Sequence, residues 1–384
     1  MKTEKLYYTD AYISSFEAKV ASVEACENGY AVVLDRTAFF PEEGGQHADS
    51  GVINGISVKN VFEKDGVIYH LLDQPLEIGS CAVGELDFAE RFDKMQQHSA
   101  EHLASGIIHS LYGAENVGFH LGPDEVTFDT DLPLTREELD KVEELVNIAI
   151  YENRKIKQSF PDSSQLSELT YRSKLELTED VRIVTIEGYD DCACCAPHVS
   201  FTGEIGVVKF IYSEKHKGGT RVYMAAGKRA YEYFGKLYKS AMGISQLLSV
   251  PVTDIAEEVL RLNESKVALE FAISEKGKAM ARVYADSLPE SNGNLTLRLP
   301  YLDPSELREF ANLTGDKIKG ILIALSGEDG NYKYVIKSHA RDVSEFIKDA
   351  NSALCGRGGG RGAMAQGSFA AAFSQIKDYF DNLT

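Results

Sequence analysis

The stretches Gln97-His-Ser-Ala-Glu-His102 and Cys194-Cys-Ala-Pro-His198 determine how the middle of this chain must fold. The first places two histidines four residues apart, so that both imidazoles lie on one face of a helix and can bind a single ion. The second places a thiol and an imidazole in a loop between two predicted strands. Together they supply a tetrahedral set of nitrogen and sulfur ligands of the kind that Zn²⁺ favours. The spacing therefore predicts a zinc site that joins a helix to a distant loop.

Spacing alone leaves the cysteine ligand open, because Cys192, Cys194 and Cys195 all lie close to His198. A free cysteine is also commonly a small buried apolar residue. Three cysteines within four positions have poor geometry for disulfides and better geometry for metal or redox chemistry. We therefore interpret the cluster as a metal site in a cytosolic protein.

The first stretch also fits the inverted zinc-peptidase motif H-x-x-E-H, in which Glu101 would be the general base. Such a peptidase needs a downstream carboxylate as its third ligand and has no use for a cysteine–histidine pair. The pair formed by Cys194 and His198 therefore counts against this alternative.

Composition bounds the protein class. The chain has 384 residues, 43% of them hydrophobic and 26% charged, which is typical of a globular protein of two to four domains. It contains neither an apolar run of about 18 residues nor an apolar N-terminal segment, so no membrane span and no signal peptide are predicted. The formal net charge of −19 argues, taken alone, against a nucleic-acid partner.

The charge is not spread evenly along the chain. Eight lysines and arginines lie between Lys209 and Lys239, and only Glu214 and Glu232 oppose them. This segment is either a solvated basic face or an electrostatic footprint for a phosphate backbone. The acidic average therefore does not exclude a nucleic-acid partner.

Hydrophobic periodicity assigns the first half of the chain. Residues 5–90 contain short strand-like runs separated by Asn-Gly and Asp-Gly turns, which indicates β-structure. Helices are predicted over residues 92–111 and 135–153, the second with Thr135 as N-cap and Glu138 completing a capping box. Two buried strands flank the cysteine cluster, at residues 181–186 and 206–212.

The second half is predicted to be helical and then mixed. Residues 230–288 have a helical pattern that Pro251 interrupts, and the apolar seam after it contains Ile255, Val259, Leu262 and Leu269. A turn-rich segment at 287–294 ends the helical part. Beyond it, a small α/β domain is predicted, with helices at 302–313 and 343–353 and strands at 318–326 and 332–338.

Two glycine-rich segments indicate close contact with a ligand. In Thr37-Ala-Phe-Phe-Pro-Glu-Glu-Gly-Gly-Gln46, the glycines allow close backbone approach and the terminal side chains can hydrogen-bond a polar substrate, although a plain β-turn is an alternative. In Cys355-Gly-Arg-Gly-Gly-Gly-Arg-Gly-Ala-Met-Ala-Gln-Gly367, glycines around two arginines predict a loop able to approach phosphates. The second segment does not match the nucleotide-binding phosphate loop.

In order and spacing, three stretches resemble the editing domain of alanyl-tRNA synthetase, which free-standing alanyl-tRNA editing proteins share. They are Leu34-Asp-Arg-Thr-Ala-Phe-Phe-Pro-Glu-Glu-Gly-Gly-Gln46, Gln97-His-Ser-Ala-Glu-His102 and Cys194-Cys-Ala-Pro-His-Val-Ser-Phe-Thr-Gly-Glu-Ile-Gly206. The C-terminal glycine-rich segment resembles the signature of the synthetase's C-terminal domain, which some phosphoesterases also contain. The resemblance covers nearly the whole chain and is to the long form of the editing proteins.

Two departures from the family pattern alter the predicted wall of the substrate pocket. The family usually has Cys-x-Gly-Thr-His where this chain has Cys194-Cys-Ala-Pro-His198, and Pro197 stiffens that loop. Glu43 stands where a third glycine is common, which makes the backbone less permissive there.

The resemblance implies an α+β fold in four parts. These are an N-terminal β-barrel at 1–90, an α/β zinc-containing editing core at 91–240, a helical linker at 241–288, and a C-terminal α/β domain of the DHH-associated, tRNA-binding type at 289–384. The implied metal ligands are His98, His102, Cys194 and His198. The implied catalytic residues are Thr37 and Gln46, with Gly44 and Gly45 binding substrate. The implied tRNA-binding residues are Arg357, Gly358, Gly359, Gly360, Arg361 and Gln366.

The implied function is zinc-dependent hydrolysis of mischarged aminoacyl-tRNA(Ala), chiefly Ser-tRNA(Ala) and also Gly-tRNA(Ala), by a cytoplasmic deacylase. The implied partner is tRNA(Ala), and a homodimer through the helical linker or the C-terminal domain is expected. A catalytically inactive tRNA-binding module is the alternative. Four ligands are typical of a closed zinc site, so either one ligand is labile or the zinc organises the pocket while a water attacks the ester. Aminoacylation and phosphodiester cleavage are not expected, because the chain leaves no room for an adenylate-forming domain and lacks an Asp-His-His motif.

Overall fold

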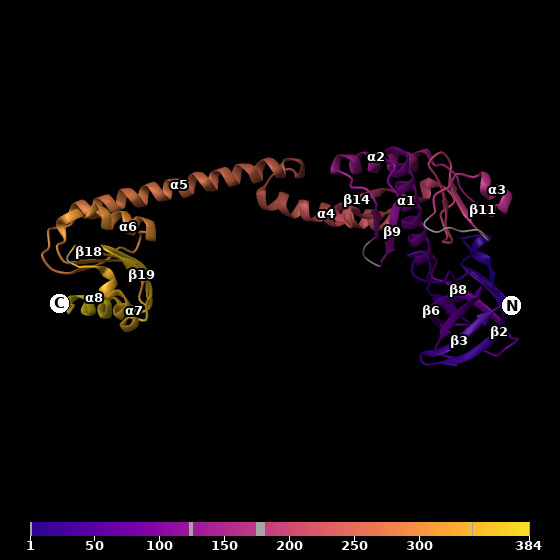
Figure 1. Ribbon diagram of the computed structural model, residues 1–384, viewed down its shortest axis with the longest axis horizontal. Helices are drawn as coiled ribbons and strands as arrows, with labels where there is room; N and C mark the ends of the chain where they lie inside the picture. Colours follow the sequence, from indigo (N-terminus) through magenta and orange to yellow (C-terminus); the bar gives the residue numbers. More distant parts are fainter. Residues whose placement is uncertain (1, 123–125, 174–180, 340, 384) are drawn as a thin grey trace. The chain divides into compact units, whose positions relative to one another are not determined.

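The computed structural model describes residues 2–122, 126–173, 181–339 and 341–383. It confirms the mixed α+β class. The chain divides into two compact units, Met1–Met242 and Gly243–Thr384, whose elements are labelled in Figure 1. Within the described ranges, none of the helices is both long and apolar enough to span a membrane.

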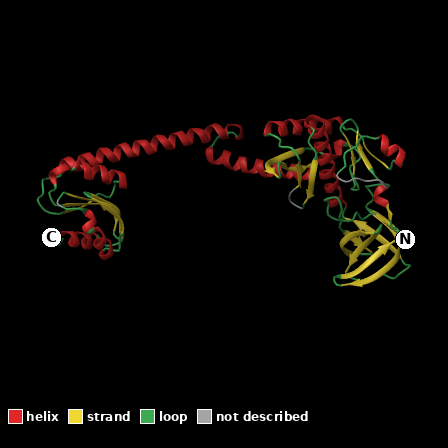
Figure 2. Cartoon of the chain, viewed as in Figure 1, coloured by secondary structure: helices red, strands yellow, loops and turns green. Residues whose placement is uncertain are grey.

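Six strands of the first unit form a closed barrel in the order β2-β3-β7-β6-β5-β8, visible in Figure 2 as the group of yellow strands below the N-terminus. They are β2 (Ser15–Cys26), β3 (Gly29–Leu34), β5 (Gly51–Ile53), β6 (Ile56–Lys64), β7 (Val67–Leu72) and β8 (Cys81–Leu86). Every second side chain of β8 and of the first half of β2 is buried, as expected for strands with one face on a core. The predicted turns close two of the hairpins, and Asn54 and Asp65 have the positive φ angles (51° and 53°) that such turns require.

The rest of the first unit surrounds helix α1 (Phe88–Tyr112). This helix packs against α2 (Arg136–Glu152) and against strands of two further sheets. One sheet has the order β14-β15-β10-β9 and the other β11-β12-β13. Their strands are β9 (Asn116–Leu121), β10 (Val126–Thr130), β11 (Ile156–Ser159), β12 (Ile183–Ile186), β13 (Asp190–Ala193), β14 (Val208–His216) and β15 (Gly219–Ala226). The short elements β1 (Glu4–Lys5), β4 (Arg36–Thr37) and α3 (Ser163–Glu168) complete the unit.

The two helices predicted for this unit are confirmed. Helix α2 begins with the predicted capping box, in which the Thr135 hydroxyl accepts from the N–H of Glu138 at 3.2 Å and the Glu138 carboxylate accepts from the N–H of Thr135 at 2.7 Å. It ends at Asn153, which has the left-handed conformation (φ 52°) common at helix C-termini.

The first turn of α1 holds the barrel loop that ends near residue 50. The Arg91 side chain is fully buried, and its Nε lies 3.0 Å from each carboxylate oxygen of Asp49. The same guanidinium donates to the Ala38 carbonyl at 2.6 Å, and Asp49 accepts from the N–H of Phe40 at 2.6 Å. This buried ion pair therefore ties the start and the end of the loop to one helix.

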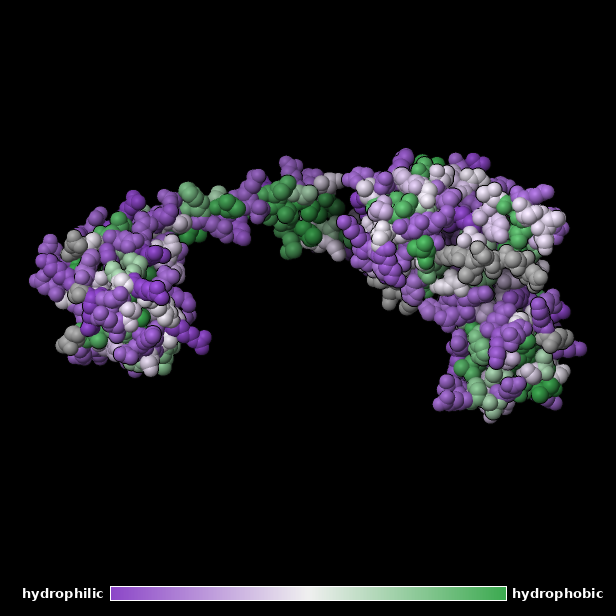
Figure 3. All heavy atoms as spheres, viewed as in Figure 1, coloured by the Kyte–Doolittle hydropathy of each residue, from purple (hydrophilic) through white to green (hydrophobic). Residues whose placement is uncertain are grey.

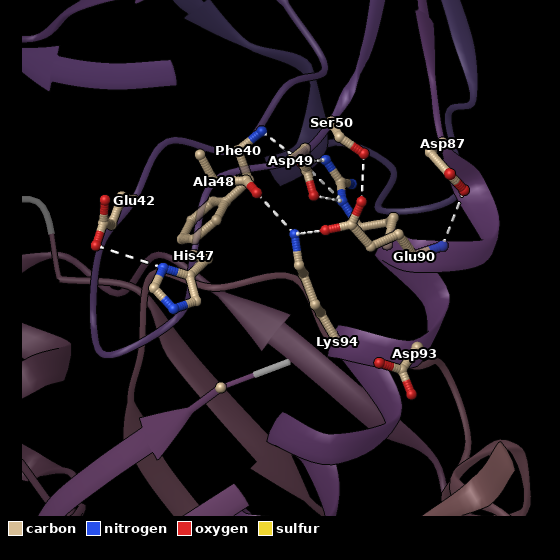
Figure 4. Close-up of polar contacts among 12 residues, drawn as sticks. Phe40, Glu42, His47, Ala48, Asp49, Ser50, Asp87, Glu90, Asp93 and Lys94 are labelled. Atoms are coloured by element: carbon tan, nitrogen blue, oxygen red, sulfur yellow. Dashed lines mark hydrogen bonds and ion pairs between the residues drawn. The ribbon is translucent and has the colours of Figure 1, made fainter. Parts of the chain in front are cut away.

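A second set of contacts supports the same loop, as Figure 4 shows. The Lys94 ammonium lies between the Ala48 carbonyl and the Glu90 carboxylate, 2.7 Å from each. Glu90 also accepts a hydrogen bond from the Ser50 hydroxyl. The loop from Phe40 to Ser50, which contains the glycine pair, is thus fixed to α1 at several points.

The second unit contains a five-stranded sheet of order β16-β17-β18-β20-β19, with helices on both faces. Alternate residues of β17 separate the two cores: Leu322 and Ala324 lie in the core with α5 and α6, and Ile323 and Leu325 in the core with α7 and α8. The strands are β16 (Leu295–Arg298), β17 (Ile321–Glu328), β18 (Asn331–Ser338), β19 (Arg357–Arg361) and β20 (Met364–Phe369). The helices are α5 (Ile255–Ser287), α6 (Pro304–Leu313), α7 (Ile347–Ala353) and α8 (Phe373–Asp381), while α4 (Gly227–Leu248) crosses the unit boundary. The predicted interruption at Pro251 lies between α4 and α5.

The prediction that the C-terminal glycine-rich segment forms a loop is wrong. It forms β19 and β20, an antiparallel hairpin at the edge of this sheet. Glycine tolerates the close approach to β20, because a Cβ on Gly360 would lie 2.0 Å from the Met364 carbonyl oxygen. The six predicted tRNA-binding residues all lie exposed on this hairpin: Arg357, Gly358, Gly359, Gly360, Arg361 and Gln366.

The basic segment from Lys209 to Lys239 is less positive in the folded chain than in the sequence. Three of its eight cations form ion pairs with acids that lie far away in the sequence. The pairs are Lys209 with Glu143 (2.6 Å), Arg221 with Asp129 (2.7 Å) and Arg229 with Asp93 (2.7 Å). This internal neutralisation weakens the interpretation of the segment as a phosphate footprint.

We expect Asp49→Ala to lower the free energy of unfolding by about 3–5 kcal/mol, because it leaves the buried Arg91 charge without its partner. Urea unfolding of the full chain measures this change. The matched control is Asp140→Ala, which removes an exposed ion pair with Arg136 and should cost less than about 0.5 kcal/mol. Equal effects of the two substitutions would contradict the role assigned to the buried pair.

Candidate functional site

Helix α1 and the segment after β13 bring four possible metal ligands together. His98 and His102 project from α1, and Cys194 and His198 from the segment between β13 and β14. The Cys194 sulfur lies 3.3 Å from Nε2 of His198 and 3.6 Å from Nε2 of His98. One ligand atom from each of the four side chains lies within 4.8 Å of the other three. The structure therefore places Cys194, rather than either neighbouring cysteine, among the three imidazoles.

These separations fit a single tetrahedral ion. With Zn–N and Zn–S bonds of about 2.0–2.3 Å, two ligands of one zinc ion lie roughly 3.3–3.8 Å apart. The two distances from the Cys194 sulfur fall within that range. The three imidazole centroids are 4.6 to 5.3 Å from one another, so the rings converge on one point. The cluster could hold a metal ion with little rearrangement.

Each imidazole also has a polar side chain at its Nδ1 atom. The pairs are Gln46 Oε1 with His98 (3.0 Å), Asp190 Oδ2 with His102 (3.3 Å) and Ser99 Oγ with His198 (2.9 Å). The partners of His98 and His198 leave Nε2 available to a metal and hold the ring in place. The Asp190 contact with His102 is an ion pair outside hydrogen-bonding geometry. Sequence reasoning missed Ser99 and Asp190, although Ser99 directly follows the first histidine of the motif.

Gln46 reaches His98 because its loop docks on strand β9. The Gly45 carbonyl accepts from the N–H of Leu121 at 3.1 Å, and a Cβ on Gly45, whose φ is +82°, would lie 2.4 Å from the Phe119 carbonyl oxygen. The glycine pair was predicted to let the backbone approach a ligand closely. At Gly45 the backbone instead approaches strand β9 of the same chain. Gln46 is fully buried, and its Nε2 atom has no hydrogen-bond partner within the described ranges.

The backbone around Cys194 is held by an arginine that sequence reasoning also missed. The Arg182 guanidinium donates to the carbonyl of Cys194 at 2.8 Å and to that of Ala196 at 2.9 Å. The N–H of Cys194 donates in turn to the Arg182 carbonyl at 3.0 Å. Ala196 is fully buried against the barrel core. The segment Cys194–His198, which departs from the family pattern, is thus fixed through its backbone.

The cluster stabilises an anionic sulfur. Burial alone raises the pKa of the Cys194 thiol, but the surrounding imidazoles outweigh burial and bring the pKa well below its ordinary value. Burial lowers the pKa of His198 to about 3. At His102 burial acts in the same direction, but the electrostatic attraction of Cys192 and Cys194 and the Asp190 carboxylate outweigh it and raise the pKa. A metal cation would replace the proton that this thiolate–imidazolium pair holds.

A cavity of about 1230 Å³ opens on the cluster. This volume exceeds the roughly 300–1,000 Å³ of typical small-molecule sites, so the cavity can admit more than a free amino acid. Gly44 and Glu43 line it from the barrel loop, next to His98, His102 and Cys194. Its basic side chains are Lys5, Arg172 and Arg182.

Thr37, predicted to act with Gln46, is fully buried and does not line this cavity. Burial lowers the pKa of its neighbour His70 to about 4, so that ring is neutral at pH 7. His70 Nδ1 lies 3.1 Å from the Val32 carbonyl and must carry the proton, which leaves Nε2 as an acceptor. The Thr37 hydroxyl therefore donates to Nε2 at 2.9 Å and accepts from the N–H of Phe39 at 3.1 Å, with one lone pair unused.

We expect the metal-free protein to retain one thiolate at pH 6, where a free cysteine is almost fully protonated. Thiolate absorbance in the ultraviolet measures this, and Cys194→Ser should abolish it. Cys355→Ser, which removes an exposed thiol in the second unit, is the control and should leave the signal unchanged. An identical spectrum in the Cys194 variant would show that another group carries the charge.

Two families of known proteins match parts of this chain. Residues 2–89 match the family described as tRNA synthetases class II (A), and residues 181–223 match the threonyl and alanyl tRNA synthetase second additional domain. The alanine–tRNA ligase of Ignicoccus hospitalis is 30% identical over 94% of this chain, which spans 41% of the ligase.

Two similar proteins have nearly the length of this chain. The alanyl-tRNA editing protein Aarsd1 of Mus musculus is 28% identical, and the match covers 93% of this chain and 92% of Aarsd1. The alanyl-tRNA editing protein AlaX-L of Pyrococcus horikoshii is 28% identical, and the match covers 98% of this chain and 96% of AlaX-L. This chain is a homologue of the alanyl-tRNA editing proteins along nearly its whole length.

Proposed function

We propose that this protein is an aminoacyl-tRNA deacylase that removes the wrong amino acid from tRNA(Ala), chiefly serine and also glycine. Water would break the ester bond between the aminoacyl carbonyl carbon and the terminal ribose oxygen, giving a free amino acid and uncharged tRNA. The observation that carries the proposal is the cluster of three imidazoles and one low-pKa thiol on the wall of a large cavity. The similarity to alanyl-tRNA editing proteins supports the choice of substrate.

The proposed cofactor is Zn²⁺, held by His98, His102, Cys194 and His198. The donor set of one thiolate and three imidazoles is one that zinc favours, and the polar partners at the three Nδ1 atoms orient the rings toward a common point. When bound, the zinc would organise the pocket and so orient the aminoacyl group. Four protein ligands leave it no free position, which favours a zinc that organises the pocket over one that carries the attacking water.

Gln46 is the residue to which we assign contact with the aminoacyl group. The unpaired Nε2 donor of Gln46 lies beside the ligand His98 and can bind an oxygen of the substrate. Selection of serine would rest on a hydrogen bond to its hydroxyl, which alanine lacks, but the buried Thr37 does not line the cavity and is not assigned that contact. A site that hydrogen-bonds a hydroxyl rejects the analogue without it far more strongly than an apolar pocket can.

The purified protein should hydrolyse Ser-tRNA(Ala) at least about a hundredfold faster than Ala-tRNA(Ala). Chelation should abolish the activity, and added Zn²⁺ should restore it.

Gln46→Ala should lower kcat/KM by about 10–100-fold, whereas His47→Ala, at the adjacent exposed position, is the matched control. Equal rates on both substrates would refute the proposal, and tRNA binding without hydrolysis would indicate an inactive tRNA-binding module.

We further propose that the β19–β20 hairpin contacts tRNA phosphates. Arg357, Gly359 and Arg361 alternate along β19 and so share one face, with Gln366 opposite Gly359 on β20. A Cβ on Gly359 would meet no atom within 4 Å, so the space between the two arginines is open. The guanidinium groups can thus reach adjacent phosphates of an RNA strand.

Replacing Arg357 and Arg361 together by alanine should weaken tRNA binding about tenfold or more at moderate salt. It should also make the plot of log K against log salt shallower by about 1.5, since two phosphate contacts are lost. Lys377→Ala, on the exposed face of α8, is the control for loss of surface charge. Binding that keeps its wild-type salt slope in the double variant would assign the hairpin a role in folding.

We also propose that two copies associate through the helical segment of the second unit. Figure 3 shows green apolar atoms gathered where α4 ends and α5 begins. The exposed large apolar side chains of this segment, among the described residues, are Ile244, Leu247, Val259, Leu260, Leu262, Val267, Leu269, Phe271, Ile273 and Val283. Several repeat at three- and four-residue spacing, which lets a second copy of the same helix supply the missing partner.

We expect Leu262→Glu to convert the dimer into a monomer, as measured by light scattering at micromolar concentration, because the charge would enter the apolar seam. Arg261→Glu introduces the same charge outside the seam and should leave the dimer intact. A monomeric wild-type protein would contradict the proposal.

A further inference from the structure

His102 also belongs to a second group of possible ligand side chains. Ligand atoms of His102, Asp190 and Cys192 all lie within 4.8 Å of one another. The Asp190 carboxylate is 3.3 Å from Nδ1 of His102. That Nδ1 atom is buried and, within the described ranges, has no partner in hydrogen-bonding geometry. The four-ligand cluster does not use Cys192 or Asp190 as ligands.

Strand β13 carries two members of this group and packs closely against α1. Asp190 and Cys192 alternate along β13 and so project from the same face of the strand. Strand β13 approaches α1 at Gly106, where a Cβ would lie 2.6 Å from the Tyr189 carbonyl oxygen and 2.7 Å from the Asp190 Cβ. A larger residue at Gly106 would push the strand away from the helix and separate Asp190 from His102.

The Asp190 carboxylate of this group is held in place by an arginine. Arg172 donates to both carboxylate oxygens of Asp190, at 2.7 and 2.9 Å, and neutralises that carboxylate. Each oxygen keeps a further lone pair, so the carboxylate can still bind a cation. Asp190 and Cys192 thus offer an oxygen and a sulfur donor close to His102.

We propose that His102 Nδ1, Asp190 and Cys192 form a second site for a divalent cation of the zinc class, with the His102 ring bridging the two sites. Nitrogen, oxygen and sulfur donors together select Zn²⁺ or Co²⁺ over Mg²⁺ or Ca²⁺. The ion would displace the remaining ring proton of His102 and the thiol proton of Cys192 to solvent. This inference rests on the proposed metal centre only in that both sites share His102.

The second site differs from the first in being open. It has three protein ligands, and catalytic zinc sites keep their fourth position for water or substrate in this way. Cys192 is partly exposed and lines the cavity, together with Asp190 and His102, so an ion can enter from there. The four-ligand site would then organise the pocket, while the three-ligand site faces the substrate space with a free coordination position.

Zinc stoichiometry of the full-length protein tests this site without measuring activity. Chelator-stripped protein is dialysed against Zn²⁺ alone, and bound metal is measured by atomic emission. We expect two ions per chain in the wild type, one in Cys192→Ala and one in Cys194→Ala. Cys26→Ala, which removes an exposed thiol at the end of β2, is the control and should keep two ions.

Each outcome separates the two metal proposals. One ion in the wild type that is retained in Cys192→Ala and lost in Cys194→Ala would overturn the second site and support the first. No bound ion would overturn both. Fewer than two zinc ions per wild-type chain would refute the second site, whether or not a variant misfolds. With Co²⁺, the thiolate-to-metal absorbance should fall by about half in Cys192→Ala, and an unchanged band would also refute the second site.

Discussion

The first unit depends on one constraint: helix α1 buries a row of polar side chains, and each of them needs a partner inside the protein. The partners come from the barrel loop, from three different strands and from the cysteine segment. The pairs are Arg91 with Asp49, Gln97 with both backbone groups of Ala226, His98 with Gln46, Ser99 with His198, Glu101 with Asn116, and His102 with Asp190. Satisfying these groups positions the surrounding segments about a single helix.

The candidate metal cluster follows from the same constraint. Burial would make an isolated thiolate or imidazolium costly, but a thiolate surrounded by imidazoles is stabilised by their charge. The residues that hold the histidines also connect the cluster to the rest of the unit, because Gln46 belongs to the barrel loop and Asp190 to β13. The stability of the barrel loop and the geometry of the cluster are therefore linked through α1.

Sequence reasoning succeeded where the signal is local. The capping box of α2, the Asn-Gly and Asp-Gly hairpins and the histidine spacing on α1 each depend on residues a few positions apart. It failed where pairing is distant. The charge of the segment after Lys209 was overestimated because Glu143, Asp129 and Asp93 neutralise part of it. The C-terminal glycines were predicted as a loop because glycine propensity does not reveal that a neighbouring strand supplies their hydrogen bonds.

The sequence by itself determined the α+β class, the helix that presents two histidines on one face, and the cysteine segment that faces them. Only the tertiary structure decided which cysteine joins the three imidazoles and which side chains lie at each Nδ1 atom. It also decided that Thr37 is buried against His70 of the barrel while Gln46 reaches the cluster. The physical reason is that ligand choice and hydrogen-bond partners depend on distances of a few ångströms between segments up to a hundred residues apart, and the packing of α1 sets these distances.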